Sequence, residues 1–338
     1  MRNANGETDD LTLVAAHRGY WEFEPENSWP AIFRAGFTCR FEIVEVDVKP
    51  AKDAPVVFHD YELERVTNGH GLLSEITAQA FTGLLMRDRH GLTNLQTGSL
   101  AHPMTTRSFL AQYGAEMMKN RQSDGRLFGP VIAFDMKAEN TADVWGMVKT
   151  VCGQITAVEQ EQIAGSLQGV VFKVESRSMP GLRDDVVNLA ATCPSLKMII
   201  VLNPPRDGEA PDINDKVIDR FAGLAQIVSY EVNYRYPGDP MGRYLTDARL
   251  RSVGTFSNYY ELPEGFGSSR ARCCFVANTD DRAVRTPGQP LDYRGRWDWY
   301  LSRDVEGGRR FNLITTDRPD LAVVYLERLG LRHTDRLQ

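Results

Sequence analysis

The sequence contains few cysteines, and their arrangement argues against a disulfide framework. Their number is odd, their spacing is scattered, and no C-x-x-C motif occurs. The adjacent pair would fall inside a strand, where neighbouring side chains point to opposite faces of a sheet. Buried thiols in a reducing cytosol are therefore the prediction for this set. Its members are Cys39, Cys152, Cys193, Cys273 and Cys274.

Long apolar runs and an excess of basic charge are also missing. The longest apolar segments, such as 198–202, are far shorter than the ~20 residues that span a bilayer. Residues 1–10 are polar and acidic, without the apolar segment of a signal peptide. The net charge is −6, from 39 Lys and Arg against 45 Asp and Glu. These absences predict a cytoplasmic protein with no integral membrane contact and no nucleic-acid partner.

Short segments rich in β-branched residues alternate with helical patterns along the chain. Apolar runs without strict alternation are typical of parallel strands that are covered on both faces. No G-x-G-x-x-G motif follows the first of them, which disfavours a doubly wound dinucleotide-binding sheet. We therefore predict an α/β fold, a single (β/α)8 TIM barrel. The strand segments are 13–17, 43–49, 131–137, 170–175, 198–203, 227–234, 253–260, 273–278 and 311–316, and the helical ones are 28–37, 107–119, 141–155, 180–193, 212–224 and 319–331.

These nine strand segments are one more than a closed barrel needs. One segment between 227 and 278 is then accessory, and we expect it to be 253–260. Two stretches, 60–130 and 279–310, are too long for ordinary connections and are expected to cover one end of the barrel. Although 338 residues would allow two domains, we expect residues 1–338 to form one.

Short polar motifs stand where several strands are predicted to end. In a barrel, side chains at the carboxyl ends of the strands point toward a common catalytic mouth. An E-x-D pair on a strand places both carboxylates on one face, because side chains repeat every two residues. The four motifs together therefore predict one site. They are His17-Arg18-Gly19, Glu45-Val46-Asp47, His59-Asp60 and Asp135-Met136-Lys137.

Three of these residues are acids on neighbouring strands. Carboxylates are hard oxygen ligands that suit Mg²⁺ or Ca²⁺ rather than zinc. Three acids in one barrel mouth would repel one another, and a divalent cation removes that repulsion. We predict that Glu45, Asp47 and Asp135 bind one Mg²⁺ or Ca²⁺ ion.

The remaining residues supply proton transfer and positive charge. His17 and His59 can share general acid and base roles, since the imidazole pKa is ordinarily about 6.5. Arg18 and Lys137 offer a planar fork and a point charge to an anion. A cation, paired histidines and basic side chains together fit the cleavage of a phosphodiester.

These motifs make the sequence resemble the glycerophosphodiester phosphodiesterase family. The match is nearly continuous over residues 13–71 and weak between 175 and 310. The resemblance implies a TIM barrel with a long excursion after the second strand, and it implies the roles given above for His17, His59, Glu45, Asp47, Arg18 and Lys137. The matching segments are HRG (17–19), PENS (25–28), EVDV (45–48), VVFHD (56–60), LERVTNG (63–69) and ITTDRP (314–319).

Two positions depart from the family pattern. Asp135 stands where the family usually has Glu, and this form also resembles the sphingomyelinase D and phospholipase D toxins, which release a cyclic phosphate. The usual Trp-Thr-x-Asn of a late strand is absent, and segment 275–279 stands in its place. The predicted function is metal-dependent hydrolysis of glycerophosphodiesters or a similar small polar, even sugar-bearing, diester. The alternatives are a phosphodiester synthase or lyase at the same site, and a non-catalytic barrel that binds a phosphorylated ligand.

The stretch 279–310 is rich in arginine and contains two of the five tryptophans, Trp297 and Trp299. Its ordinary interpretation is a solvated loop with salt bridges. The sharper hypothesis is a specificity loop, in which both indoles stack on the substrate and select its alcohol.

Overall fold

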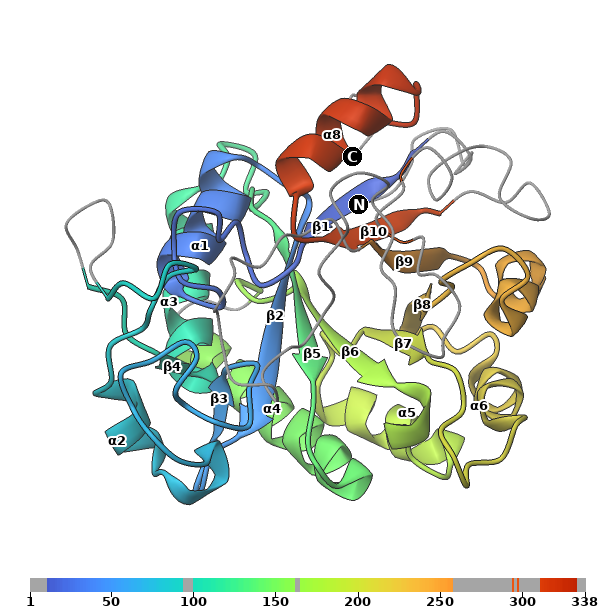
Figure 1. Ribbon diagram of the computed structural model, residues 1–338, viewed down its shortest axis with the longest axis horizontal. Coiled ribbons are helices and arrows are strands. Elements are labelled where there is room, and N and C mark those ends of the chain that lie inside the picture. Colours follow the sequence, from blue (N-terminus) through green and yellow to red (C-terminus); the bar gives the residue numbers. More distant parts are fainter. Residues whose placement is uncertain are drawn as a thin grey trace.

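The computed structural model describes residues 11–93, 100–161, 165–257, 294, 297 and 311–332. Eight parallel strands form a closed barrel with helices around it (Figure 1). Pairing between the first and second strands closes the ring. The predicted (β/α)8 TIM barrel is confirmed. In barrel order its strands are β1 (Leu13–Ala16), β2 (Ile43–Pro50), β5 (Val131–Met136), β6 (Val170–Glu175), β7 (Met198–Leu202), β8 (Ile227–Val232), β9 (Val253–Ser257) and β10 (Leu313–Thr316).

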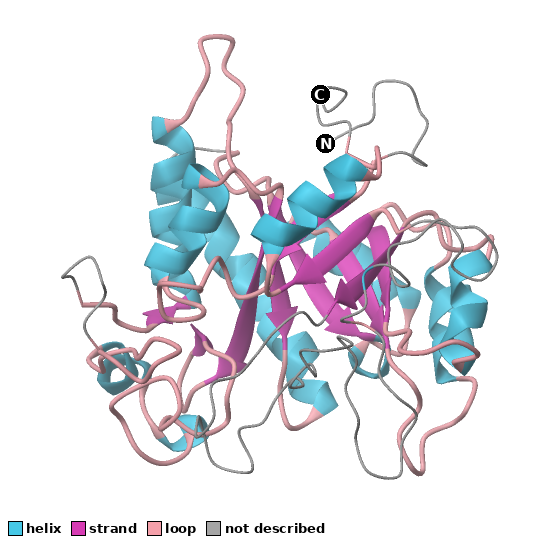
Figure 2. Cartoon of the chain, turned by 45° about the horizontal axis from the view of Figure 1, so that its top comes forward, coloured by secondary structure: helices cyan, strands magenta, loops and turns pink. Residues whose placement is uncertain are grey.

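Helices cover the outside of the barrel (Figure 2). The predicted segment 28–37 begins where the Ser28 hydroxyl accepts a hydrogen bond from the Ala31 amide, and it continues as a wider π-helical turn. The helices are α1 (Trp29–Phe33), η1 (Arg34–Thr38), η2 (Leu73–Glu75), α2 (Ala78–Thr82), α3 (Thr106–Lys119), α4 (Thr141–Glu161), η3 (Ser176–Ser178), α5 (Arg183–Thr192), α6 (Ile213–Phe221), η4 (Pro240–Thr246) and α8 (Pro319–Arg328).

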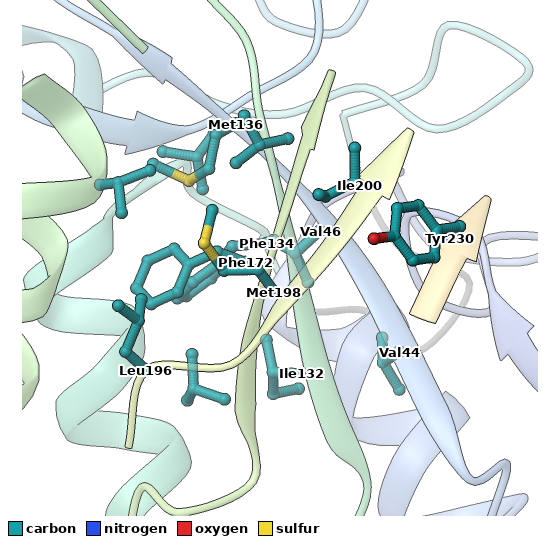
Figure 3. Close-up of a cluster of buried hydrophobic side chains, with 14 of the residues drawn as sticks. Val44, Val46, Ile132, Phe134, Met136, Phe172, Leu196, Met198, Ile200 and Tyr230 are labelled. Carbon is teal, nitrogen blue, oxygen red and sulfur yellow. The ribbon is translucent and has the colours of Figure 1, made fainter. Parts of the chain in front are cut away.

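The barrel strands are buried on both faces, as their apolar composition predicts. Side chains of alternate residues, including Val46, Phe134 and Ile200, point outward and form the main core with the helices (Figure 3). The other residues point into the barrel. Near the amino ends of the strands these inward residues form a small apolar layer, and two residues further along they are polar on every contributing strand except β7, which has Val201. The apolar layer consists of Ala15, Ile43, Ala133, Ile199 and Leu313.

The excursion predicted over 60–130 is present, and it begins with a short antiparallel extension of β2. The outer part of β2 pairs with β3 (Pro55–Val57), which pairs in turn with β4 (Met104–Thr105). A separate hydrophobic cluster that includes Val56, Phe58 and Phe81 supports this extension. The excursion thereby holds the residues that follow β3 close to the carboxyl ends of β2 and β5.

The expectation that 253–260 is an accessory strand is wrong. Val253–Ser257 is the barrel strand β9, which pairs with β8 on one side and with β10 on the other. Its side chains are small or apolar and all five residues are buried, as a position between two strands requires. The competing segment 273–278 lies outside the described residues.

The expectation of free buried thiols is also wrong for two cysteines. Cys152 of α4 and Cys193 at the end of α5 form a disulfide, with their Cα atoms 5.7 Å apart. Both residues lie in the core between neighbouring helices, where their side chains meet. Cys39 is an exposed free thiol, and Cys273 and Cys274 lie outside the described residues. The argument from these two residues for a reducing compartment therefore loses its basis.

Within the described ranges, no helix combines the length and the apolar character needed to cross a membrane.

Candidate active site

The predicted site residues of β1 and β2 meet at the carboxyl end of the barrel. His17 directly follows β1, while Glu45 and Asp47 are inward-facing residues of β2. Single ligand atoms of these three side chains lie within 4.8 Å of one another, and all three residues are buried. This cluster forms the centre of the candidate site.

The turn after β1 has an unusual backbone that the H-R-G motif makes possible. Gly19 has a φ of 84°, and a Cβ there would lie 2.8 Å from the carbonyl carbon of Ala31, so only glycine fits. Arg18 has a φ of 58°, which is uncommon for a residue with a side chain. In this turn the Arg18 guanidinium contacts Glu26 at 3.0 Å and Asp47 at 3.1 Å. The buried Arg18 side chain therefore holds Asp47 and Glu26 in place by ion pairing.

Both predicted histidines contact a carboxylate through Nδ1. His17 lies 2.6 Å from Asp317, the residue after β10, and His59 lies 2.7 Å from its neighbour Asp60. Such a contact fixes the orientation of the ring and assigns proton exchange to Nε2. Burial, followed by the positive charge of Arg18, lowers the pKa of His59 to about 4. His59 is therefore neutral near pH 7.

The two acids of β2 have opposite electrostatic environments. Burial and the charge of Asp47 raise the pKa of Glu45 to about 7. Burial alone would raise the pKa of Asp47 as well, but the charge of Lys137 and of other nearby cations holds it well below its ordinary value. Asn27 fixes Asp47 further, because its amide donates to Oδ2 at 2.9 Å and its oxygen accepts from the Asp47 backbone amide at 3.0 Å.

This cluster fits a divalent cation. Glu45 Oε2 accepts a hydrogen bond from the Arg18 amide at 3.1 Å, whereas the buried Oε1 accepts none from the described residues. A carboxylate oxygen that is buried and lacks a donor is costly unless a cation binds it. Glu45 and Asp47, with His17 beside them, offer the hard oxygen donors that Mg²⁺ or Ca²⁺ prefers.

The third predicted ligand is not part of this cluster. Asp135 contacts Lys137 at 2.9 Å and Lys173 at 3.7 Å. Lys137 also donates to Asp47 at 2.7 Å, so this lysine bridges the two aspartates. The predicted phosphate contact Lys137 therefore pairs with acids here, although it also lines the cavity described below.

Two residues of the site were not found from the sequence. Lys173 of β6 and Glu231 of β8 form a buried ion pair of 3.1 Å, and Thr315 donates to the same glutamate at 3.0 Å. The Lys173 ammonium lies 3.7 Å from Glu45 Oε1. Each of Lys173 and Glu231 is a charged residue within an otherwise largely apolar strand, and this pattern could have indicated both as site residues. This pair extends the polar network from the cluster of His17, Glu45 and Asp47 across the barrel.

A cavity of about 570 Å³ opens beside His59 and Lys137. Its walls come from the segment after β3 and from the carboxyl ends of β5, β6 and β7. Four acidic and four basic side chains line it, together with Tyr61 and several apolar residues. The cavity is therefore suited to a polar molecule larger than a phosphate group.

The hypothesis that two tryptophans face the substrate does not fit the position of Trp297. Only 3% of this residue is exposed, its indole donates to the Ser257 hydroxyl at 2.6 Å, and its ring packs against Tyr325 of α8. Trp297 is thus a core residue in this structure and offers no ring face for stacking. Trp299 lies outside the described residues.

Comparison with known proteins gives both sequence and structural relatives. The model of the glycerophosphoryl diester phosphodiesterase family matches residues 17–121. A relative from Sinorhizobium fredii, the uncharacterized protein y4eD, is 32% identical over 346 residues, which cover 97% of this chain and 86% of the relative.

Two solved structures share the fold. A glycerophosphoryl diester phosphodiesterase from Parabacteroides distasonis has a TM-score of 0.54 at 15% identity and covers 95% of this chain and 88% of its own. An Oleispira antarctica phosphodiesterase, in complex with the product sn-glycerol-3-phosphate, has a TM-score of 0.53 at 16% identity and covers 94% of this chain and 97% of its own. The family match over residues 17–121 and the barrel identify the chain as a glycerophosphoryl diester phosphodiesterase-like TIM barrel, and members of that family are phosphoric diester hydrolases.

Proposed function

We propose that this protein hydrolyses glycerophosphodiesters or closely related small polar phosphodiesters with the help of one divalent cation. The observation that supports it best is the pair of buried histidines, each oriented by a carboxylate, beside two acids of which one has an unsatisfied oxygen. The Oleispira antarctica relative binds sn-glycerol-3-phosphate as its product, and the same product class is proposed here.

His59 is the proposed general base. Its low pKa leaves Nε2 unprotonated near pH 7, and the residue lines the cavity where a diester would lie. A neutral imidazole in this position accepts the proton of the attacking hydroxyl or water.

His17 is the proposed general acid. Its Nδ1 contacts Asp317 at 2.6 Å and its Nε2 lies 3.9 Å from Glu45, so Asp317 orients the ring and leaves Nε2 for proton transfer. A protonated His17 gives its proton to the leaving alcohol oxygen, which would otherwise depart as an unstable alkoxide.

Glu45 and Asp47 would hold the cation, which supplies positive charge against the phosphoryl oxygens. Lys137, at the edge of the cavity, adds a second positive charge to the same group. Arg18 acts indirectly in this proposal, since it fixes Glu26 and Asp47 and does not line the cavity. Asp135 completes the electrostatic balance around Lys137.

The test is hydrolysis of glycerophosphoglycerol by the purified protein with Mg²⁺ or Ca²⁺, followed by phosphorus NMR. The expected products are glycerol phosphate and glycerol. A cyclic phosphate that accumulates without opening would favour the lyase alternative, and a new diester formed with an added alcohol would favour the synthase. Absence of all three products, with a folded protein and either cation present, would contradict the proposal.

A further inference from the structure

Lys49 is a buried cation beside the site that forms no ion pair within 4.0 Å with the described residues, although Asp47, Asp60 and Asp135 are near enough to act on its charge. It lies on β2 two residues after Asp47, so its side chain points to the same face as Glu45 and Asp47. Only 3% of the residue is exposed, yet its side chain lines the cavity. Its ammonium nitrogen lies over the ring of Tyr61, 3.1 Å from the ring centre.

The other buried cations near the site have carboxylate partners. Lys137 binds Asp47 and Asp135, and Lys173 binds Glu231. Burying a charge without a partner is costly, and such a charge is retained where it contacts a ligand. The ring of Tyr61 compensates in part and holds the ammonium in place. Because Lys49 lines the cavity and forms no ion pair with a described carboxylate, its ammonium can donate hydrogen bonds to a molecule bound there.

The location of Lys49 indicates which part of a substrate it would meet. Asp47 and Lys49 are one strand repeat apart, which is about 7 Å. If the scissile phosphate lies at the acids and His59, the ammonium lies beside the group esterified to it. The basic side chains at the far wall do not compete for this role, because Arg177 is paired with Glu175 and Glu209, each at 2.8 Å.

We propose that Lys49 selects the alcohol portion of the substrate by donating hydrogen bonds to its oxygen atoms. The preferred alcohol is a polyol, such as glycerol, a cyclitol or a sugar, and a cationic alcohol such as choline is disfavoured. This inference rests on the proposed function. The equal number of acidic and basic groups around the cavity agrees with an uncharged, oxygen-rich occupant. Tyr61, 44% exposed at the cavity wall, offers a ring against which such a group can lie.

The experiment compares kcat/KM for glycerophosphoinositol, glycerophosphoglycerol and glycerophosphocholine. The unaltered protein should prefer the two polyol diesters. Lys49→Met keeps the length and the contact with the Tyr61 ring but removes the charge and the donors. It should lower kcat/KM for the polyol diesters by about 10- to 100-fold, the loss expected for a hydrogen bond to a charged group. Hydrolysis of the choline diester should be unchanged or faster.

Two matched variants separate this role from a structural one. Tyr61→Phe keeps the ring and should keep the preference. Lys52→Met alters an exposed lysine of the same hairpin and should behave like the unaltered protein. An equal loss on all three substrates would overturn the inference, since Lys49 would then act on the shared phosphate, and so would no change at all. A protein that hydrolyses none of the three would instead contradict the proposed function.

Discussion

Single side chains determine the chemistry of this site, and the contact between His17 and Asp317 is an example. The two residues are separated by 300 positions and meet at 2.6 Å because β1 and β10 are neighbours in the closed barrel. The sequence motif around Asp317 predicts an ordered end for the last strand. Its role as the partner of His17 follows only from the closure of the barrel.

Replacing either histidine with alanine should reduce kcat by at least ~100-fold, the low end of what a proton-transfer group contributes. Steady-state kinetics on glycerophosphoglycerol, with circular dichroism to verify folding, would measure this. His70→Ala is the matched control, because the His70 side chain is 81% exposed and should be dispensable. Full activity of His17→Ala or of His59→Ala would exclude the proposed proton transfers.

The sequence predicts that His17, Glu45 and Asp47 lie together, and the structure brings their ligand atoms within 4.8 Å, because strand ends in a barrel converge. His59 follows β3 in the excursion and lies in a separate group with Glu26 and Asp60. It does not predict how Asp135 and Lys137 pair, since ion pairs depend on side-chain reach across strands. The sequence suggests a substrate contact for Trp297, because tryptophan among arginines is typical of a binding loop. Its burial against Tyr325 depends on how α8 packs against it, and the local pattern that predicts this helix does not show that packing.

Among the elements, the turn after β1 and the segment after β3 are joined by one arginine. Arg65 donates to Glu26 at 2.5 and 2.7 Å and to Asp60 at 2.5 and 2.8 Å. Asp60 in turn contacts His59, so this junction positions a proposed catalytic base. Segment 63–69, which matches the family pattern, therefore has a structural role through Arg65.

The junction should make stability depend on pH under acidic conditions. Burial would raise the pKa of Glu26, but the charges of Arg65 and Arg18 outweigh it and lower the pKa to about 2. A lowered pKa stabilises the folded state above the ordinary value of 4.5, and this contribution is lost as the pH falls toward 2. Glu26→Gln should cost about 3 kcal/mol of unfolding free energy at pH 7. In urea titrations the difference should shrink steadily below pH 4.5, and a difference that does not depend on pH would contradict the electrostatic explanation.

The link between α4 and α5 should contribute stability through its bond. The disulfide spans 41 positions, and closing a loop of this size stabilises a protein by about 4 kcal/mol in the chain-entropy account. A reducing agent should therefore lower the Tm of the protein by several degrees. The double variant Cys152→Ser, Cys193→Ser should show a low Tm that the agent does not change, whereas Cys39→Ser should respond like the unaltered protein. Equal Tm values with and without reductant, once thiol titration shows reduction, would be the contrary result.

For the whole molecule, the fold is the feature that the sequence predicts best. Alternating strands and helices define the barrel, and the excursion after β2 is long enough to be recognised by length alone. The choice of the accessory strand fails because two apolar segments compete late in the chain. Only pairing with β8 and β10 identifies Val253–Ser257 as the barrel strand. The disulfide was missed because its cysteines meet through the packing of two helices that are separated by β6.

Chelation of metal should affect the molecule as a whole. With EDTA the activity should disappear, and added Mg²⁺ or Ca²⁺ should restore it. The cation should also raise the Tm, since a ligand at 100 times its Kd stabilises the folded state by ~2.7 kcal/mol. Glu45→Gln should lose activity and should show no rise in Tm with metal. In EDTA this variant should be at least as stable as the unaltered protein, because a neutral amide replaces a buried acid whose charge is unfavourable without the cation. A Tm rise of equal size in this variant would place the cation elsewhere.

The assembly of the site depends on the pairing register of one long strand, β2. This strand bears Glu45, Asp47 and Lys49 on its inner face, and Val44, Val46 and Val48 on its outer face. A slip of one residue in its pairing would exchange the two sets, exposing the valines to the barrel interior and moving every charged group into the core. A chain with this slip would therefore be much less stable, so the hydrophobic pattern of β2 selects the register that also assembles the site. Insertions and deletions should be tolerated in the excursion beyond Leu72, which is the last of its residues to line the cavity, but not within this strand.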